Sequence, residues 1–200
     1  MPLKIKLIIF LLFGFGFSQF QDSTQTQIPL SKQLLWGQNG IIRKLNIAPE
    51  SRKAELKLRH KMLKTHQTLG LVTLGMMGYQ FYLGEQLYEG HEVDASAHKY
   101  LGYSTFATYL TTASLSIGAP PAMRYSDGVS SIKLHRFLSY IHFAGMLAMP
   151  YLGYLSAGNL DYVENDVEYN YSEKALKAHY LVGHITFYSF SLAFLTTLLP

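Results

Sequence analysis

The chain has 200 residues, of which 48% are hydrophobic and 15% are charged, whereas about 25% charged residues is usual in soluble proteins. It contains no cysteine, which excludes disulfides, iron–sulfur clusters and c-type haem attachment. The net charge is +4, but the basic residues are interspersed with apolar helical sequence rather than with a surface of aromatic residues. This distribution argues against nucleic acid as a partner.

Residues 1–18 have the pattern of a secretory signal peptide. Lys4 and Lys6 supply the positive start, residues 7–17 form a short apolar core, and Gly16 and Ser18 suit a cleavage site. The apolar run is too short to cross a bilayer, for which about 20 residues are needed. A short uncleaved anchor is the alternative.

Residues 19–64 form a second segment, polar at first and then basic and amphipathic. From Leu34 onward, aliphatic residues alternate with Arg and Lys, and Pro49 can begin a helix that continues through six basic residues. An apolar and basic segment of this kind, beside a membrane, lies at the lipid headgroups. The alternative is a basic surface that attracts an anionic reductant or redox partner.

Four apolar stretches follow, at residues 66–83, 98–118, 135–155 and 179–199. Acidic loops separate the first from the second and the third from the fourth, and Pro120 and Pro121 end the second. We interpret residues 65–200 as one domain with four membrane-spanning helices. The predicted fold is therefore an all-α, integral membrane, up-down four-helix bundle, with a soluble helical bundle as the alternative.

Each of these four stretches begins with the same local pattern. A histidine is followed by an apolar residue three positions later and by Gly or Ser four positions later, and positions i and i+4 share one face of a helix. The small residue leaves space one turn from the imidazole, as a flat macrocycle held by that imidazole requires. The four pairs are His66 with Gly70, His98 with Gly102, His135 with Ser139, and His179 with Gly183.

The alternating direction of consecutive helices sorts the histidines into two pairs. His66 and His135 are expected near one end of the bundle, and His98 and His179 near the other. We therefore predict two b-type haems, each held by two histidines through the iron. With both axial positions filled by protein, electron transfer is favoured over oxygen chemistry. His142, seven residues after His135 and on nearly the same face, is the rival ligand.

In these features the chain resembles the cytochrome b561 superfamily, in particular the membrane core that follows dopamine-monooxygenase-like domains in the ferric-reductase branch. The matching features are His135 followed by Pro150, and the step from His179 to Gly183. The chain departs from the family at His184 and Met149, where relatives often have Arg and Gln. The resemblance implies four helices, one histidine each, two b haems, and electron transfer across a membrane, often from ascorbate.

The sequence thus predicts a membrane-embedded dihaem protein that carries electrons, with no catalytic residue assigned. The alternatives are a haem-free membrane scaffold or assembly subunit, and a transmembrane oxidoreductase with an ascorbate-like or quinol donor. The expected location is a multi-pass position in the cell (inner) membrane, for a bacterial protein, with the mature N-terminus outside. Signal cleavage favours this orientation, although the distribution of basic residues favours the reverse. The expected partners are membrane lipid and an unidentified electron donor and acceptor, and a homodimer is left open.

Overall fold

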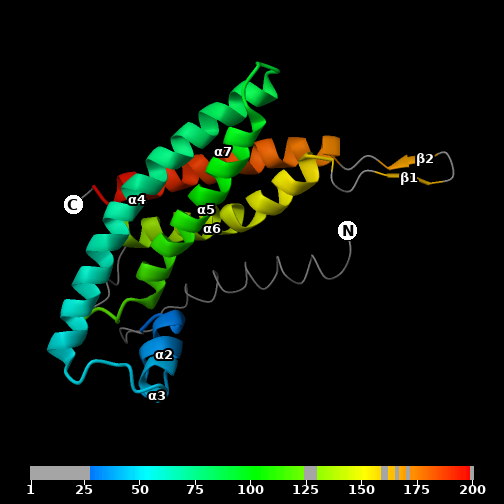
Figure 1. Ribbon diagram of the computed structural model, residues 1–200. Helices are drawn as coiled ribbons and strands as arrows, with labels where there is room; N and C mark the ends of the chain where they lie inside the picture. Colours follow the sequence, from blue (N-terminus) through cyan, green and yellow to red (C-terminus); the bar gives the residue numbers. More distant parts are fainter. Residues whose placement is uncertain (1–27, 124–129, 159–161, 165–166, 170–171, 199–200) are drawn as a thin grey trace. The chain divides into compact units, whose positions relative to one another are not determined.

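The computed structural model describes residues 28–123, 130–158, 162–164, 167–169 and 172–198. The predicted signal peptide, residues 1–18, lies outside the described residues. The chain is predominantly helical. Its helices are α2 (Leu30–Trp36), α3 (Ile41–Lys44), α4 (Arg52–Tyr88), α5 (Ala95–Gly118), α6 (Ser131–Ser156) and α7 (Ser172–Thr196) (Figure 1).

The predicted membrane spans are wrong. No helix in the part of the chain that the structure describes is long and apolar enough to cross a membrane. The helix α4 has 37 residues, but its first half is basic. Hydroxyl-bearing and aromatic polar residues recur along α5, and α6 begins with Lys133 and Arg136 among its apolar residues. The helices exist where the sequence predicted them, but the integral membrane bundle that we expected them to form is not supported.

The chain divides into two compact units. The first contains residues 1–69 and 110–130, and the second contains residues 70–109 and 131–200. Both α4 and α5 therefore contribute one part to each unit. The two units are described in turn.

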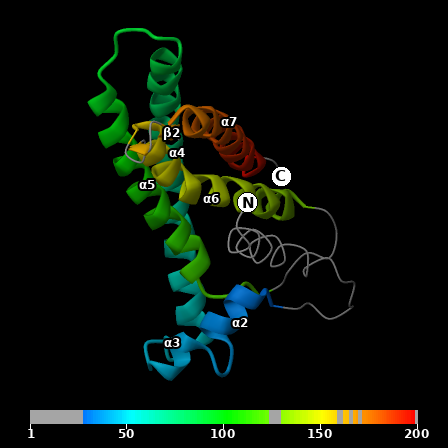
Figure 2. The same ribbon diagram turned by 90° about the vertical axis from the view of Figure 1, so that its right-hand side faces the viewer.

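In the first unit, cationic and indole side chains cover the end of α5. Lys32 Nζ donates to the carbonyl oxygens of residues 116 and 119 at 2.7 Å, and Trp36 Nε1 donates to the carbonyl of residue 118 at 2.9 Å. Arg59 Nη1 donates to the carbonyl of residue 120 at 2.6 Å. The last carbonyls of a helix have no partner within the helix and carry its negative dipole end, so positive donors stabilise them. Figure 2 shows α2 beside this end of α5.

A buried carboxylate joins α3 to the start of α4. The Glu55 side chain is 3% exposed and accepts hydrogen bonds from Arg43, at 2.7 Å, and from Arg52. Two cations and their hydrogen bonds compensate the cost of burying this charge. The Glu55 carboxylate therefore fixes the path of the chain between the two helices.

In the second unit, α6 and α7 lie side by side (Figure 1). At Gly145 of α6 there is no room for a Cβ atom, because the Thr186 side chain of α7 occupies that space. The ring of Tyr109, from α5, packs near Phe190 of α7 with ring centres 6.0 Å apart. The ring of Phe81, from α4, stacks on Phe187 of α7 at 4.7 Å. The last part of α4 and the first part of α5 thus pack against the pair formed by α6 and α7.

A short antiparallel hairpin lies between α6 and α7. Its strands are β1 (Tyr162–Glu164) and β2 (Val167–Tyr169), paired with Tyr162 opposite Tyr169. The sequence analysis interpreted this region as an acidic loop and did not predict strands there.

Candidate functional site

Two of the four predicted histidines face each other inside the second unit. The imidazole rings of His98, on α5, and His179, on α7, have centres 6.1 Å apart and planes inclined by 69°. His98 lies in the first turn of α5, whereas α7 begins two turns before His179, earlier than the sequence pattern predicted. The antiparallel topology therefore brings together one of the two predicted pairs.

Two glycines lie close to these rings, one on each of the other long helices in the unit. A Cβ atom at Gly84 of α4 would lie 3.2 Å from His98 Cε1, and one at Gly153 of α6 would lie 3.3 Å from His179 Cε1. Any larger residue would press on the rings. All four long helices thus contribute to the surroundings of the histidine pair.

Polar atoms around the pair have hydrogen-bonding capacity that is not used. Gln80 Nε2 donates to the His98 carbonyl oxygen at 2.9 Å and lies 3.1 Å from both ring nitrogens of His98. Gln80 Oε1 is buried and has no hydrogen-bond partner among the described residues. His179 Nδ1 is also buried without a partner of good geometry, although the backbone of Met149 lies close enough to raise the pKa of His179 slightly against the effect of burial. Buried polar atoms without partners are uncommon, and a redox role is one of the explanations for them.

Burial keeps both imidazoles in the neutral form. Removal from water lowers the pKa of His98 below its ordinary value of 6.5. The same cause, followed by the repulsion from His98, lowers the pKa of His179 from 6.5 to about 4. Near pH 7 both rings are therefore uncharged, and neutral imidazole is the form that binds metals.

The distance between the rings suits two imidazoles on opposite sides of one metal ion. A metal-bound imidazole nitrogen lies about 2 Å from the ion, which places the two ring centres roughly 6 to 6.5 Å apart. Two histidines supply only two ligands, so a metal ion bound between them would need further ligands. A haem, whose porphyrin supplies four ligands, would provide these, and His98 and His179 are the residues that would hold it. In the described ranges of the chain, no group of three or more His, Cys, Asp or Glu side chains could hold a metal ion by itself.

The other two predicted ligands each donate to a backbone carbonyl. His66 Nδ1 lies 2.8 Å from the carbonyl oxygen of Thr112, and His135 Nδ1 lies 2.8 Å from that of Ala193. A carbonyl can only accept, so Nδ1 carries the proton in each ring and Nε2 carries the lone pair. His66 belongs to the first unit and His135 to the second, and their pairing stays a prediction.

The four small residues of the sequence pattern have different surroundings. A Cβ at Gly70 would meet nothing within 4 Å, one at Gly102 would lie 3.1 Å from Gln80 Nε2, and one at Gly183 would lie 3.4 Å from Met149 Cε. Ser139 Oγ donates to the carbonyl of Arg136 in its own helix. The space beside the imidazole is thus open at Gly70, whereas side chains border it at Gly102 and Gly183.

The rival ligand His142 is buried in the core of the second unit. It is 6% exposed, its Nδ1 forms a hydrogen bond with Tyr109 Oη at 2.8 Å, and its ring meets that of Phe190 edge-on at 5.0 Å. Burial raises the pKa of Tyr109 well above its usual range, so this hydroxyl stays protonated. The choice of His135 rather than His142 as the ligand on α6 stays a prediction.

A polar cluster connects α7 to α4 through His184. His184 Nε2 lies 3.3 Å from Glu85 Oε1, and the hydroxyl of Tyr180 donates to Glu85 Oε2 at 3.1 Å. The rings of Tyr180 and Tyr88 stack with centres 3.9 Å apart. This cluster orients α7 against α4, the helix that carries Gln80 and Gly84.

Sequence reasoning missed three residues around the histidine pair, namely Gln80, Gly84 and Gly153. None of them belongs to the repeated histidine pattern, so only the packing of the helices reveals them.

No protein-family model, no curated protein and no solved structure matches this chain. The resemblance to the cytochrome b561 superfamily therefore rests on the sequence pattern and stays a prediction.

Proposed function

We propose that this protein binds a b-type haem between His98 and His179 and acts as an electron carrier. The observation that carries the proposal is the pair of half-buried imidazoles with ring centres 6.1 Å apart. They come from two helices whose sequences share one local pattern. Burial favours the neutral state of both rings, which is the ligating state.

Each neighbouring residue has a definite role in this proposal. Gly84 and Gly153 let the backbones of α4 and α6 approach the rings, which restricts the rotation of both imidazoles. Gln80 lies against His98 and supplies an amide donor to it. A bound haem supplies one-electron chemistry at its iron. His98 and His179 would hold the haem iron, and with both of them as ligands the bound group would serve electron transfer rather than substrate binding.

An absorption spectrum of the purified protein tests the proposal. We expect a b-type α-band in the reduced-minus-oxidised difference spectrum and a low-spin ferric state. Replacing His98 or His179 with Leu should remove the haem held by this pair. The matched control is His91→Leu, because the His91 side chain is 57% exposed and lies in the connection before α5. A protein that takes up no haem, or one whose haem content is unchanged by both replacements, would contradict the proposal.

A further inference from the structure

The basic side chains of the first unit fall into two groups. Those that face other elements have partners: Arg43 and Arg52 bind Glu55, and Lys32 and Arg59 bind carbonyls at the end of α5. The side-chain amino groups of four lysines of α4 have no hydrogen bond or ion pair with any described residue. These are Lys53, Lys57, Lys61 and Lys64, and all of them are exposed.

The four lysines form one continuous face, which we name the lysine face. At about 100° per residue, positions 53, 57, 61 and 64 fall within an arc of about 80° on the helix, and they extend over about 17 Å of its length. The first half of α4 contains a single acidic residue, Glu55, and its buried carboxylate lies on the opposite side. No carboxylate of α4 therefore neutralises the lysine face.

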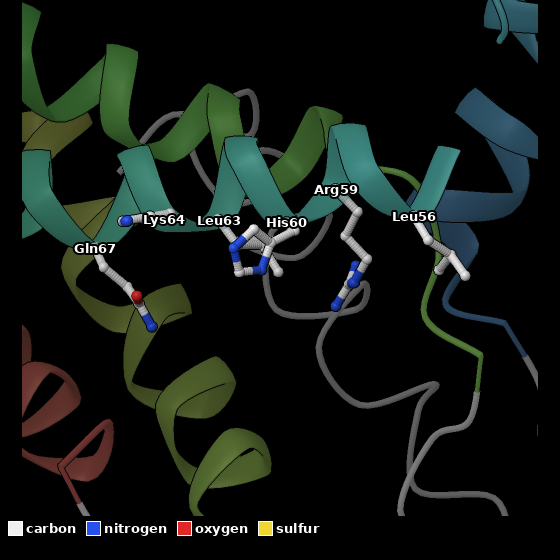
Figure 3. A pocket seen from close by; sticks show the side chains of 6 residues that line it. All are labelled: Leu56, Arg59, His60, Leu63, Lys64 and Gln67. Atoms are coloured by element: carbon white, nitrogen blue, oxygen red, sulfur yellow. The ribbon is translucent and has the colours of Figure 1, made fainter. Parts of the chain in front are cut away.

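A shallow hollow of about 520 Å³ adjoins this face along the same helix. Figure 3 shows the side chains that line it: Leu56, Arg59, His60, Leu63, Lys64 and Gln67. The two leucines are only half-buried, and they lie beside cationic and amide groups. The hollow thus combines apolar and positive character, as a site for an amphiphilic anion would.

The turn that precedes α4 presents two aliphatic side chains. Asn46 adopts the left-handed conformation, with φ 54°, which Asn tolerates better than most residues. Leu45 and Ile47, on either side of it, are 62% and 63% exposed. Exposed aliphatic residues close to a basic helical face are the two components of interfacial membrane binding.

We propose that the first unit binds the surface of an anionic lipid bilayer, with the lysine face on the headgroups and the Leu45–Ile47 turn in the interface. The lysines supply attraction to anionic lipids, and the turn supplies apolar contact that does not depend on lipid charge. Here α4 lies along the bilayer surface and does not cross it. The proposal is independent of haem binding.

Cosedimentation of the full chain with vesicles tests this directly. We expect binding to vesicles of phosphatidylcholine with about 30% phosphatidylserine, weak binding to phosphatidylcholine alone, and release as salt rises above about 0.5 M. Replacing Lys53, Lys57, Lys61 and Lys64 together with Gln should lower the apparent affinity at least tenfold. Replacing Leu45 and Ile47 with Ser should weaken the binding that remains at high salt.

A matched control separates the lysine face from net charge. It replaces four lysines of the second unit with Gln, namely Lys99, Lys133, Lys174 and Lys177, and should change the affinity less than twofold. Circular dichroism checks that each variant keeps its helical content. Equal losses in the two quadruple variants, equal binding to both kinds of vesicle, or lysine-dependent binding to single-stranded RNA with none to vesicles would each overturn the proposal.

Discussion

The low pKa of His179 makes a prediction about stability and pH. The pKa of His179 is about 4 in the folded protein and 6.5 when the side chain is exposed to water, as in the unfolded chain. Between these two values the unfolded chain therefore binds more protons than the folded one. The free energy of unfolding should therefore fall as the pH decreases from about 6.5 to about 4, and this contribution should then level off. A shift of this size corresponds to about 3 kcal/mol. Urea unfolding of the haem-free protein at several pH values measures it.

The His179→Leu variant should lose most of this dependence, because it removes the group that titrates. His91→Leu, at an exposed position, should keep it. If the slope between pH 6.5 and 4 is the same in the His179→Leu variant and in the original protein, another group causes it and the imidazole pair is not neutralised by burial.

The hydrogen bond between Tyr109 and His142 predicts a smaller effect. Tyr109→Phe removes the hydroxyl that forms a hydrogen bond with His142 Nδ1 at 2.8 Å, so His142 loses one buried partner. We expect a loss of about 1–2 kcal/mol in the free energy of unfolding, with haem content unchanged. Tyr103→Phe is the control, since Tyr103 is 49% exposed, and it should be neutral. If Tyr109→Phe leaves the free energy of unfolding unchanged, water replaces the hydroxyl as the partner of His142 without destabilising the fold.

The buried Glu55 predicts how firmly α3 is joined to α4. Glu55→Gln keeps the size of the side chain but leaves Arg43 and Arg52 without their carboxylate. Because both arginine side chains are 40% exposed and partly solvated, we expect a loss of about 2 kcal/mol, below the range for a fully buried pair. Glu50→Gln, at an exposed position, should change the free energy of unfolding by less than about 0.5 kcal/mol. Thermal or urea unfolding of both variants gives the comparison.

The glycines that face the histidine pair predict that overpacking there lowers both haem occupancy and stability. Gly153→Val places a branched side chain against the His179 ring, where even a Cβ would lie at 3.3 Å. We expect reduced haem occupancy and a loss of about 1–3 kcal/mol from overpacking. Gly78→Val is the matched control on α4, since a Cβ there meets nothing within 4 Å. Normal haem content in Gly153→Val would show that this glycine serves helix packing alone.

The positions of the helices could be predicted from the sequence, whereas the prediction that they span a membrane was wrong. Apolar stretches and the helix start after Pro49 located α4 to α7 from sequence alone, because these signals are local. The membrane assignment failed because it relied on the count of apolar residues, whereas Ser, Thr and charged residues along the helices lower their mean hydropathy below that of a membrane span. The hairpin of β1 and β2 was missed because strands of three residues show too little alternation to detect.

The histidine site shows the same division between local and long-range information. His98 and His179 could be predicted from spacing and alternating helix direction, and the structure places their rings together. Gln80, Gly84 and Gly153 could not, since each reaches the pair only through packing against another helix. The spacing rule and the expected depth both favoured His135 over His142, which lacks the small residue four positions later. Burial and hydrogen bonding now distinguish the surroundings of these two residues without assigning the ligand.

Charge is divided unevenly between the two units. The described residues of the first unit contain nine Lys and Arg but only Glu50 and Glu55 as acids, whereas acidic residues predominate in the sequence of the second unit. The proposed lipid contact and the proposed redox site thus belong to different units. Each can be tested by variants that leave the other unit unchanged.

Counting haem tests the redox prediction over the whole chain. The four-histidine pattern predicts about two b haems per protein, and a pyridine haemochrome assay measures this number. His98→Leu should leave one haem, His135→Leu should leave one, and the double variant should leave none, whereas His142→Leu should keep both. A single haem that is lost in His98→Leu and kept in His135→Leu would restrict the function to the His98–His179 pair.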